Sequence, residues 1–457
     1  MMWIRTCFST FLAAALCLLS WPGLAQSRSG AQAGERWVTT WATAQQLMPM
    51  TFGPRGGGRG GPAPAAPSAQ APKPVAEQRD ARPPRGGRGG PMAFPVPQTF
   101  ADQTVRMIVR ASLGGSRLRI ALSNMLNAQP LEIGAAHIAV HKAGGAIVEG
   151  TDRSLTFGGR SSFTIQPGVL ALSDPADLEV APLSDLAVSL YLPRDTGPPS
   201  THMVGLRTAY ISKGDATGSA AMPEPVIMAS YVWLSSVEVA APADAFTVVA
   251  LGDSITDGFA TTRDAERAWP ALLARRLQAT AKTRHVAVVN QGISGNQVLR
   301  DGAGLSALAR FDRDVLSRPG VRWVVLLEGI NDINIRGRTD GPNALTADEL
   351  IWGYRQIIAR CHAQGIKVLG ATIMPEEGVF TASERGEAIR QAVNQWIRAK
   401  GNFDAMVDFD VVVRDPQRPA RIKPEFDPGD HIHPNDAGNQ AMADAFDLGL
   451  FRPRRKP

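Results

Sequence analysis

The sequence is poor in cysteine, with only three in 457 residues. Cys7 and Cys17 fall in residues 1–25, where Arg5, a following apolar run and a small-residue cleavage site have the layout of a secretory signal peptide. We therefore expect export to the periplasm or the extracellular space, and a mature chain that keeps only Cys361. A single cysteine cannot form a disulfide within its own chain, so a disulfide-stabilised scaffold is excluded.

Long hydrophobic runs are also missing. The apolar stretch of the predicted signal peptide is too short to span a bilayer comfortably, and no later segment of the sequence qualifies. We therefore expect no transmembrane segment in the mature chain. Cys361 follows two isoleucines on a run with helical spacing, so we interpret it as a buried apolar side chain and not as a nucleophile.

A broad basic surface is missing as well. The formal net charge is +6, but residues 51–97 hold seven Lys or Arg against two Asp or Glu, so this segment carries most of the excess. It is rich in Pro, Gly and Ala, and Pro54–Pro62 nearly recurs as Pro84–Pro91. Such a composition cannot bury a core, so we predict a disordered insert at about 49–97. The rest of the chain is near neutral, and we expect no nucleic-acid partner.

Residues 100–239 show strand signals and almost no helix signal. Residues 104–110 and 117–122 alternate polar and apolar side chains, and Gly, Asn, Asp and Pro interrupt such runs at short intervals. This pattern predicts an all-β sandwich over residues 35–239, with Trp37 and Trp41 packing into it and the insert as a loop between two of its strands. The pattern does not distinguish a carbohydrate-binding module from a module that only packs against the second half of the chain.

The second half of the chain alternates strands with helices, which predicts a parallel sheet covered on both faces. The strand-like runs are residues 247–251, 286–290, 323–327, 366–373 and 405–409, and the helix-like runs are 269–281, 346–364, 383–400 and 437–450. We expect this α/β domain to occupy residues 245–450, joined to the sandwich by a short linker at 240–244.

Ser254 follows the first of these strands, in Gly252-Asp-Ser-Ile. The carboxyl end of a parallel strand is where α/β folds present reactive groups to a crevice. A serine hydroxyl is a weak nucleophile unless a base accepts its proton. Ser254 is therefore a candidate nucleophile, with a helix N-cap as the alternative interpretation.

His433 is the candidate base, because Asp430 precedes it by three residues on one loop and can orient its ring. His431 and His433 also form a His-x-His pair close to Asp427, Asp430 and Asp436, which leaves a metal site as the alternative.

Two further strand ends carry neutral hydrogen-bond donors. Asn290 is followed by Gly292 and Gly295, and the strand at 323–327 is followed by Asn331. Glycine lets a backbone N–H approach a ligand closely, and an amide side chain offers a fixed donor. Such donors can stabilise an oxyanion. An ordinary turn residue is the alternative for Asn331, and Glu328 and Asp257 are possible supporting residues.

These segments, in this order, resemble the four blocks of the SGNH (GDSL-type) hydrolase family, which carry Ser, Gly, Asn and an Asp-x-x-His pair. The resemblance covers about residues 245–450. It implies a five-stranded doubly wound parallel sheet of the flavodoxin-like kind, preceded here by the all-β sandwich. It also implies that Ser254 is the nucleophile, His433 the base and Asp430 the residue that orients it.

The resemblance further implies an oxyanion hole formed by the backbone N–H groups of Ser254 and Gly295 and by the side chain of Asn331. Gly295 is preferred to Gly292 because the family's glycine usually lies five residues after the Asn that ends the strand. No metal or organic cofactor is expected.

The expected function is that of a secreted serine esterase acting through an acyl-enzyme on a small-molecule or polysaccharide ester, with acetyl or other short-chain esters on carbohydrate as the favoured substrates. The alternative within enzymes is a lysophospholipase or short-chain lipid esterase. The alternative outside enzymes is a secreted carbohydrate-binding protein with an inactive hydrolase scaffold.

Overall fold

The computed structural model describes residues 35–46 and 96–452. The predicted signal peptide lies outside the described residues, and so does the predicted insert apart from its last two positions. In the part of the chain that is described, no helix is both long and apolar enough to cross a membrane.

The chain up to residue 242 forms two antiparallel sheets, and the described residues in this region contain no helix. The first sheet has the order β1 (Glu35–Ala42), β16 (Leu234–Pro242), β3 (Gly115–Ser123), β10 (Ala176–Val180), with β9 (Leu170–Leu172) also paired to β3. The second has the order β14 (Val226–Met228), β13 (Ala209–Lys213), β2 (Gln103–Arg110), β11 (Asp185–Leu192), β5 (Ala135–Ala143), β6 (Ala146–Ile147), with β7 (Arg153–Ser154) also paired to β5. Two short pairs complete it: β4 (Leu131–Ile133) with β8 (Phe163–Ile165), and β12 (Thr201–His202) with β15 (Tyr231–Val232).

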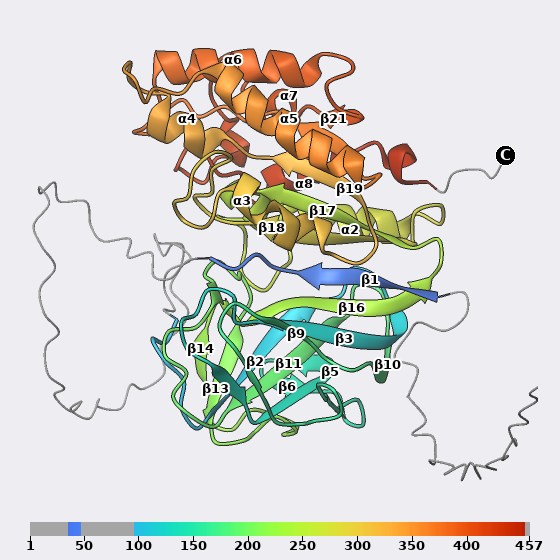
Figure 1. The fold of residues 1–457 in the computed structure, drawn as a ribbon. Coiled ribbons are helices and arrows are strands. Elements are labelled where there is room, and N and C mark those ends of the chain that lie inside the picture. Colours follow the sequence, from blue (N-terminus) through green and yellow to red (C-terminus); the bar gives the residue numbers. More distant parts are fainter. Residues whose placement is uncertain (1–34, 47–95, 453–457) are drawn as a thin grey trace, which may run out of the picture. The chain divides into compact units, whose positions relative to one another are not determined.

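The two sheets enclose one hydrophobic core, as the alternating pattern predicts. Trp233 and Phe100 are fully buried in it, and their rings meet edge to face with centroids 5.3 Å apart. The prediction of an N-terminal β-rich region is therefore confirmed (Figure 1).

The prediction for the two early tryptophans is half wrong. Trp41 packs against the sandwich core and against Tyr231, with ring centroids 4.9 Å apart. Trp37 is not part of that core and lies beneath the guanidinium of Arg119, 4.4 Å from the ring centroid. The cause is a bulge between Thr39 and Trp41, where the register of β1 against β16 shifts. A bulge inserts one residue and changes which side chains share a face.

The second half of the chain forms a parallel sheet in the order β18 (Val286–Gly292), β17 (Phe246–Gly252), β19 (Val321–Leu327), β20 (Lys367–Ala371), β21 (Ala405–Val407). Counted along the chain this order is 2-1-3-4-5, the doubly wound arrangement of flavodoxin. Every residue of β17 is buried, as expected for a strand covered on both faces. The predicted fold class is confirmed.

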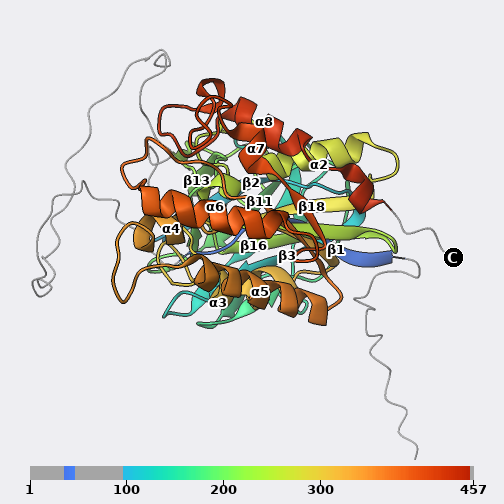
Figure 2. The ribbon, with the colours of Figure 1, turned by 90° about the horizontal axis from the view of Figure 1, so that it is seen from above.

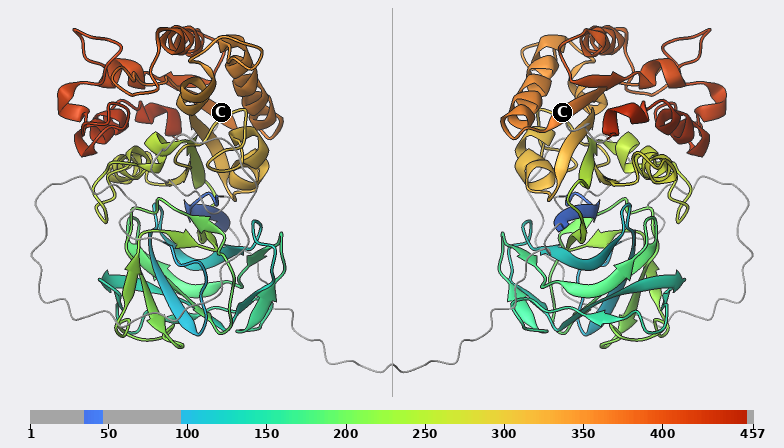
Figure 3. Two further views of the ribbon diagram at one scale, coloured as in Figure 1. Left: turned by 90° about the vertical axis from the view of Figure 1, so that its left-hand side faces the viewer. Right: turned by 90° about the vertical axis from the view of Figure 1, so that its right-hand side faces the viewer.

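Helices cover both faces of this sheet. The main ones are α2 (Trp269–Ala279), α4 (Ile330–Arg336), α5 (Ala347–Ala363), α6 (Glu384–Arg398) and α8 (Asp436–Asp444). Shorter ones are α1 (Ser254–Asp257), α3 (Ala307–Phe311), α7 (Phe409–Val413), the π-helical η1 (Asp312–Leu316) and the 3₁₀ turns η2 (Pro424–Phe426) and η3 (Leu448–Phe451). The helices α2, α7 and α8 pack together, while α3, α5 and α6 pack together and α4 packs against α6. Figures 2 and 3 show these two groups on opposite sides of the sheet.

Several predicted elements are longer than the observed ones, among them the strand expected over 366–373, which is Lys367–Ala371, and in two cases polar residues cap a new turn. The strand expected over 405–409 ends at Val407, since Asp408 accepts a hydrogen bond from Val411 N at 3.2 Å and begins α7. The helix expected over 437–450 ends at Asp444, and Asp447 then caps η3 through Gly449 N at 2.7 Å. Side-chain caps of this kind end one element and begin the next.

The sandwich and the parallel sheet are tied together by hydrogen bonds of β1 and its neighbours. Thr39 N donates to Pro319 O at 3.0 Å, and Thr247 Oγ1 donates to Thr39 O at 2.9 Å. Val288 N, on the edge strand β18, donates to Ser112 Oγ at 3.1 Å. The strand β16 runs past the predicted domain end at residue 239, and the division into domains stays a prediction.

Candidate active site

Ser254 is the first residue of the short helix α1, directly after the turn that ends β17. The N-cap is Asp253, whose Oδ1 accepts from Ile255 N at 2.9 Å, so the helix-cap interpretation of Ser254 is wrong. Only glycine fits at position 252, since a Cβ there would collide with Thr256 and with the carbonyl of Leu327. The chain therefore turns sharply and directs Ser254 to the carboxyl end of the sheet.

His433 and Asp430 meet Ser254 at this point. Ser254 Oγ lies 2.8 Å from His433 Nε2, and His433 Nδ1 lies 2.7 Å from Asp430 Oδ2. Asp430 Oδ1 also accepts from the backbone N–H groups of Ile432, at 3.1 Å, and His433, at 3.0 Å. With Nδ1–H donating to Asp430, the lone pair of Nε2 faces Ser254, and the hydroxyl donates to it.

The surroundings keep Asp430 ionised. Burial acts to raise the pKa of Asp430, but the hydrogen bond and charge of His433 outweigh it, and the pKa lies below its usual value. The ring of Phe259 lies against His433, with centroids 4.5 Å apart. The imidazole is therefore held by a carboxylate on one side and by an apolar ring on another.

The loop after β18 distinguishes the two candidate glycines. Gly292 N donates to Asn290 Oδ1 at 2.9 Å, so its N–H is already engaged. Gly295 has a φ of +82° and follows Ser294 in a turn closed by Asn296 N donating to Ile293 O at 2.9 Å. A positive φ at the third position is the signature of a type II turn. Within the described residues, neither Gly295 N–H nor Ser254 N–H has a recorded acceptor.

Asn331 lies in the first turn of α4, after Gly329, whose φ of +115° allows the chain to leave β19 sharply. One hydrogen of its Nδ2 donates to Asn296 O at 2.8 Å. The side chain is thus fixed to the turn that contains Gly295, with a second amide hydrogen left to donate. The structure therefore brings together the two strand ends predicted to carry oxyanion donors, the one after β18 with Gly295 and the one after β19 with Asn331.

Sequence reasoning missed Arg310, whose side chain is fully buried beneath these turns. It donates to Gly252 O at 3.0 Å, to Gln291 O at 2.7 Å and to Asn296 Oδ1 at 2.9 Å. It forms ion pairs with Asp314, at 3.3 Å, and with Glu328, at 3.9 Å. A single arginine on the short helix α3 has no local pattern that distinguishes it from a surface residue, so the sequence offers no signal for this role.

Three acidic side chains are buried close to one another, and one of them, Glu328, lies 3.9 Å from Arg310. Burial raises the pKa of Asp253 to about 7 and that of Asp332 to about 6, and it also raises the pKa of Glu328. Asp332 accepts from Val298 N at 2.8 Å and Leu299 N at 3.1 Å, whereas neither Oε of Glu328 has a hydrogen-bond partner among the described residues. Of these three, the sequence predicts only Glu328 as a possible supporting residue of the site, and it does not single out Asp253 or Asp332.

The alternative of a metal site finds no donor set in the described residues. His431 Nδ1 pairs with Asp427 Oδ2 at 2.5 Å, and His433 pairs with Asp430. Each imidazole of the His-x-His pair therefore has its own carboxylate. Within residues 35–46 and 96–452, no group of three or more His, Cys, Asp or Glu side chains is arranged to hold a metal ion.

Residues 250–441 match the model of the GDSL-like Lipase/Acylhydrolase family. The matched region spans β17 to α8 and contains Ser254, Gly295, Asn331, Asp430 and His433. No curated protein gives a significant match to the chain.

Several solved structures are similar to the same half of the chain. A lipolytic protein of the G-D-S-L family from Desulfitobacterium hafniense is 21% identical over 44% of this chain and 96% of its own, with a TM-score of 0.34. An acetylxylan esterase from Geobacillus stearothermophilus is 23% identical over 45% of this chain and 94% of its own, with a TM-score of 0.34. An aryl esterase from M. smegmatis is 18% identical over 44% of this chain and 96% of its own, with a TM-score of 0.35.

Replacing Arg310 with Met should destabilise the protein severely. Three buried acceptors would each lose one hydrogen bond, the Asp314 and Glu328 carboxyl groups would each lose one ion-pair partner, and breaking a buried charged network costs about 3–5 kcal/mol. We expect the free energy of unfolding in urea to fall by about this amount. The matched control is Arg194→Met, which removes an ion pair with Glu132 whose arginine side chain is 80% exposed. A loss no larger than that of the control would contradict this role for Arg310.

Replacing Asp253 with Asn should make the protein more stable at high pH. The pKa of Asp253 is about 7 in the folded protein and about 4 in an unfolded chain, so stability is lost as the pH rises through this interval. Asn keeps the cap on Ile255 N and has no proton to lose. We expect the Tm to exceed that of the wild type at pH 8, by about 3 °C or more, and to match it near pH 4.

The control for this measurement is Asp312→Asn, at an exposed carboxylate. Equal Tm shifts at pH 4 and pH 8 for Asp253→Asn would show that burial does not raise the pKa of Asp253.

Proposed function

We propose that the chain is a serine esterase with Ser254, His433 and Asp430 as its catalytic residues, within the region that matches the GDSL-like Lipase/Acylhydrolase family model. The observation that carries the proposal is the continuous chain of hydrogen bonds from Ser254 Oγ through the His433 ring to Asp430, with distances of 2.8 and 2.7 Å. A nucleophile, a base and an orienting acid within hydrogen-bond reach are what acyl transfer requires.

In the first step, Ser254 Oγ attacks the ester carbonyl carbon while His433 Nε2 takes the hydroxyl proton. The ionised Asp430 stabilises the imidazolium that results. The carbonyl oxygen becomes an oxyanion, and the free N–H groups of Ser254 and Gly295 and the second amide hydrogen of Asn331 are its donors. Each such preorganised donor contributes about 3–4 kcal/mol to transition-state stabilisation.

In the second step, His433 returns its proton to the leaving alcohol and the carbon–oxygen bond to that alcohol breaks. A water molecule then gives a proton to His433 and attacks the acyl-enzyme, and the collapse of the second tetrahedral intermediate restores Ser254 and releases the carboxylic acid. Every proton in this cycle passes through His433, and no metal or organic cofactor has a step in it.

The favoured substrates are acetyl or other short-chain esters on carbohydrate. A cavity of about 540 Å³ is bordered by the four carboxylates of Glu376, Glu377, Glu384 and Glu387. The cavity adjoins the catalytic loop, since Gly378 lies against the ring of His431. Glu377 and Glu387 pair with Arg418 and Arg390, and burial raises the pKa of Glu376 to about 7, so the cavity offers hydrogen-bonding groups more than free negative charge. Such groups bind sugar hydroxyls, which supports a polyhydroxylated substrate.

We also propose that the protein is exported, because the sequence of residues 1–25 has the layout of a signal peptide. A secreted enzyme that removes acyl groups from polysaccharide would meet its substrate outside the cytoplasm. The partner is then a small-molecule or polysaccharide ester.

The nucleophile is tested by replacing Ser254 with Ala. We expect kcat for p-nitrophenyl acetate to fall about 10⁴- to 10⁶-fold, since removal of the attacking oxygen leaves only binding and oxyanion stabilisation. The circular dichroism spectrum should be unchanged. Ser317→Ala, at the exposed C-terminal end of η1, is the control and should keep full activity. A Ser254→Ala enzyme with wild-type turnover would falsify the assignment.

The substrate class is tested with p-nitrophenyl esters from acetyl to palmitoyl, followed by acetylated xylan and lysophosphatidylcholine. We expect kcat/KM to be highest for acetyl and butyryl esters, and acetate release from xylan. Activity that rises with chain length would identify a lipid esterase instead. Absence of hydrolysis with every ester, together with xylan binding, would identify a carbohydrate-binding protein with an inactive scaffold.

A further inference from the structure

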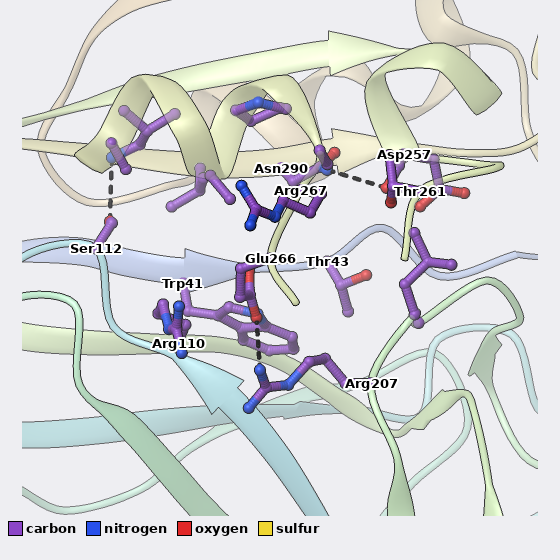
Figure 4. A pocket seen from close by; sticks show the side chains of 18 of the residues that line it. Trp41, Thr43, Arg110, Ser112, Arg207, Asp257, Thr261, Glu266, Arg267 and Asn290 are labelled. Atoms are coloured by element: carbon purple, nitrogen blue, oxygen red, sulfur yellow. Dashed lines mark hydrogen bonds and ion pairs between the residues drawn. The ribbon is translucent and has the colours of Figure 1, made fainter. Parts of the chain in front are cut away.

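The sandwich and the hydrolase region meet at a pocket of about 110 Å³. Figure 4 shows side chains from both sides of it, with Arg110 and Arg207 on the sandwich side and Asp257 and Asn290 on the other. Asp257 belongs to α1, the helix that begins with Ser254. The pocket therefore reaches the back of the catalytic helix.

His202 connects the sandwich to the hydrolase region. It comes from β12 of the sandwich region, and its Nε2 lies 2.9 Å from Asp257 Oδ1. Both side chains are buried, with 4% and 3% of their surface exposed. An ion pair removed from water is retained only where its partners are well satisfied. A single histidine in a two-residue strand has no sequence pattern that connects it to Asp257.

The contacts of His202 favour its imidazolium form. Its Nδ1 lies 2.7 Å from Ala44 O, and a carbonyl oxygen can only accept, so Nδ1 carries a hydrogen. Its Nε2 faces the Asp257 carboxyl group at 2.9 Å, where a hydrogen on Nε2 would be donated to Oδ1. Burial acts to lower the pKa of His202, but the Asp257 charge and the hydrogen bonds outweigh it and raise the pKa.

The other oxygen of Asp257 holds the turn that contains Gly295. Asp257 Oδ2 accepts from Ser294 N at 3.0 Å and from Ser294 Oγ at 2.7 Å. Ser294 is the second residue of the type II turn, directly before Gly295. The direction of the Gly295 N–H depends on the plane of the peptide between Ser294 and Gly295, so fixing Ser294 fixes that N–H.

The same carboxylate is rigidly connected to the nucleophile. Asp257 N donates to Asp253 O at 2.9 Å, and Gly258 N donates to Ser254 O at 3.0 Å. Asp257 thus relates two elements: α1, which bears the N–H of Ser254, and the turn, which bears the N–H of Gly295. Their relative position decides whether both donors can reach one oxyanion, and displacements of about 1 Å in such sites are costly.

We propose that His202 of the sandwich is a positioning residue for the oxyanion hole. It acts through Asp257 and Ser294 on the N–H of Gly295. The sandwich is then an obligatory part of the active site of the proposed esterase, on which this inference rests, and not only a binding or packing module.

The test compares His202→Gln and His202→Ala with wild type in the full chain, using p-nitrophenyl acetate. Active sites are counted by the burst from a p-nitrophenyl phosphonate that reacts with the serine. We expect kcat per titrated site to fall about 10- to 100-fold, which is typical when a residue that orients a functional group is removed. We expect KM to stay within about threefold of the wild-type value. Gln should retain more activity than Ala, because its amide can still donate to Asp257.

The matched control is His137→Gln. His137 is another sandwich histidine with a carboxylate partner, Asp152 at 2.8 Å. It lies in β5, which belongs to the second of the two main sheets, whereas His202 lies in the β12–β15 pair. We expect its kcat per site to equal that of wild type.

A purely structural role for His202 would lower the Tm and the fraction of titratable sites but leave kcat per site unchanged, and this result would overturn the proposal. Should both His202 variants fail to fold, Ser294→Ala removes one of the two hydrogen bonds to Asp257 without touching the interface. An unchanged kcat per site in that variant would also overturn it. An inactive wild type, or an active Ser254→Ala enzyme, would instead refute the proposed function.

Discussion

The guanidinium of Arg310 is the interaction on which the rest of the site depends. It joins Gly252 at the end of β17, Gln291 at the end of β18 and Asn296 in the following turn. The carbonyl of Asn296 in turn receives the amide of Asn331 from α4. Backbone carbonyls at strand ends have lost their ladder partners, and burial without a donor would be unfavourable. One planar, permanently charged group donates to two such carbonyls and to the side-chain oxygen of Asn296, and it sets the spacing between the segments.

The site also buries acidic side chains, where the ionised form of a carboxyl group is least stable. Asp253, Glu328 and Asp332 are buried close to one another, only Glu328 of the three pairs with Arg310, and burial raises the pKa of all three. Neutral carboxyls are retained in the folded protein over a range of pH in which the unfolded chain would ionise. Such local departures from good packing and pairing are typical of functional sites, where the geometry of the reacting groups takes precedence over stability.

The sandwich and the hydrolase region share more than a linker. Ser112 accepts from the edge strand β18, Thr39 bonds to both β17 and the segment before β19, and His202 reaches the catalytic helix. An uncovered sheet edge is open to aggregation, so the sandwich protects β18. The interface thus combines protection of the sheet with, in our proposal, support of the oxyanion hole.

Much of the architecture could be predicted from local patterns. Apolar runs between turn residues identified the five parallel strands, the alternating runs identified the sandwich, and Ser254, Asn331 and the Asp430–His433 pair each stood at a recognisable strand or helix boundary. The misplaced Trp37 and the shortened elements at Val407 and Asp444 show the limit of such patterns, since a bulge or a side-chain cap changes one or two hydrogen bonds and leaves the periodicity almost unaltered.

The sequence by itself determined which chemistry the chain can perform, because a hydroxyl, an imidazole and a carboxylate had to be present at the ends of buried elements. Only the tertiary structure decided how these groups are held. Arg310 and Gly252 are 58 positions apart, and His202 and Asp257 are 55 apart, and neither pair has a local pattern. Periodicity records which face of an element is buried, but a hydrogen bond between distant side chains depends on the packing of whole elements, and no local spacing encodes it.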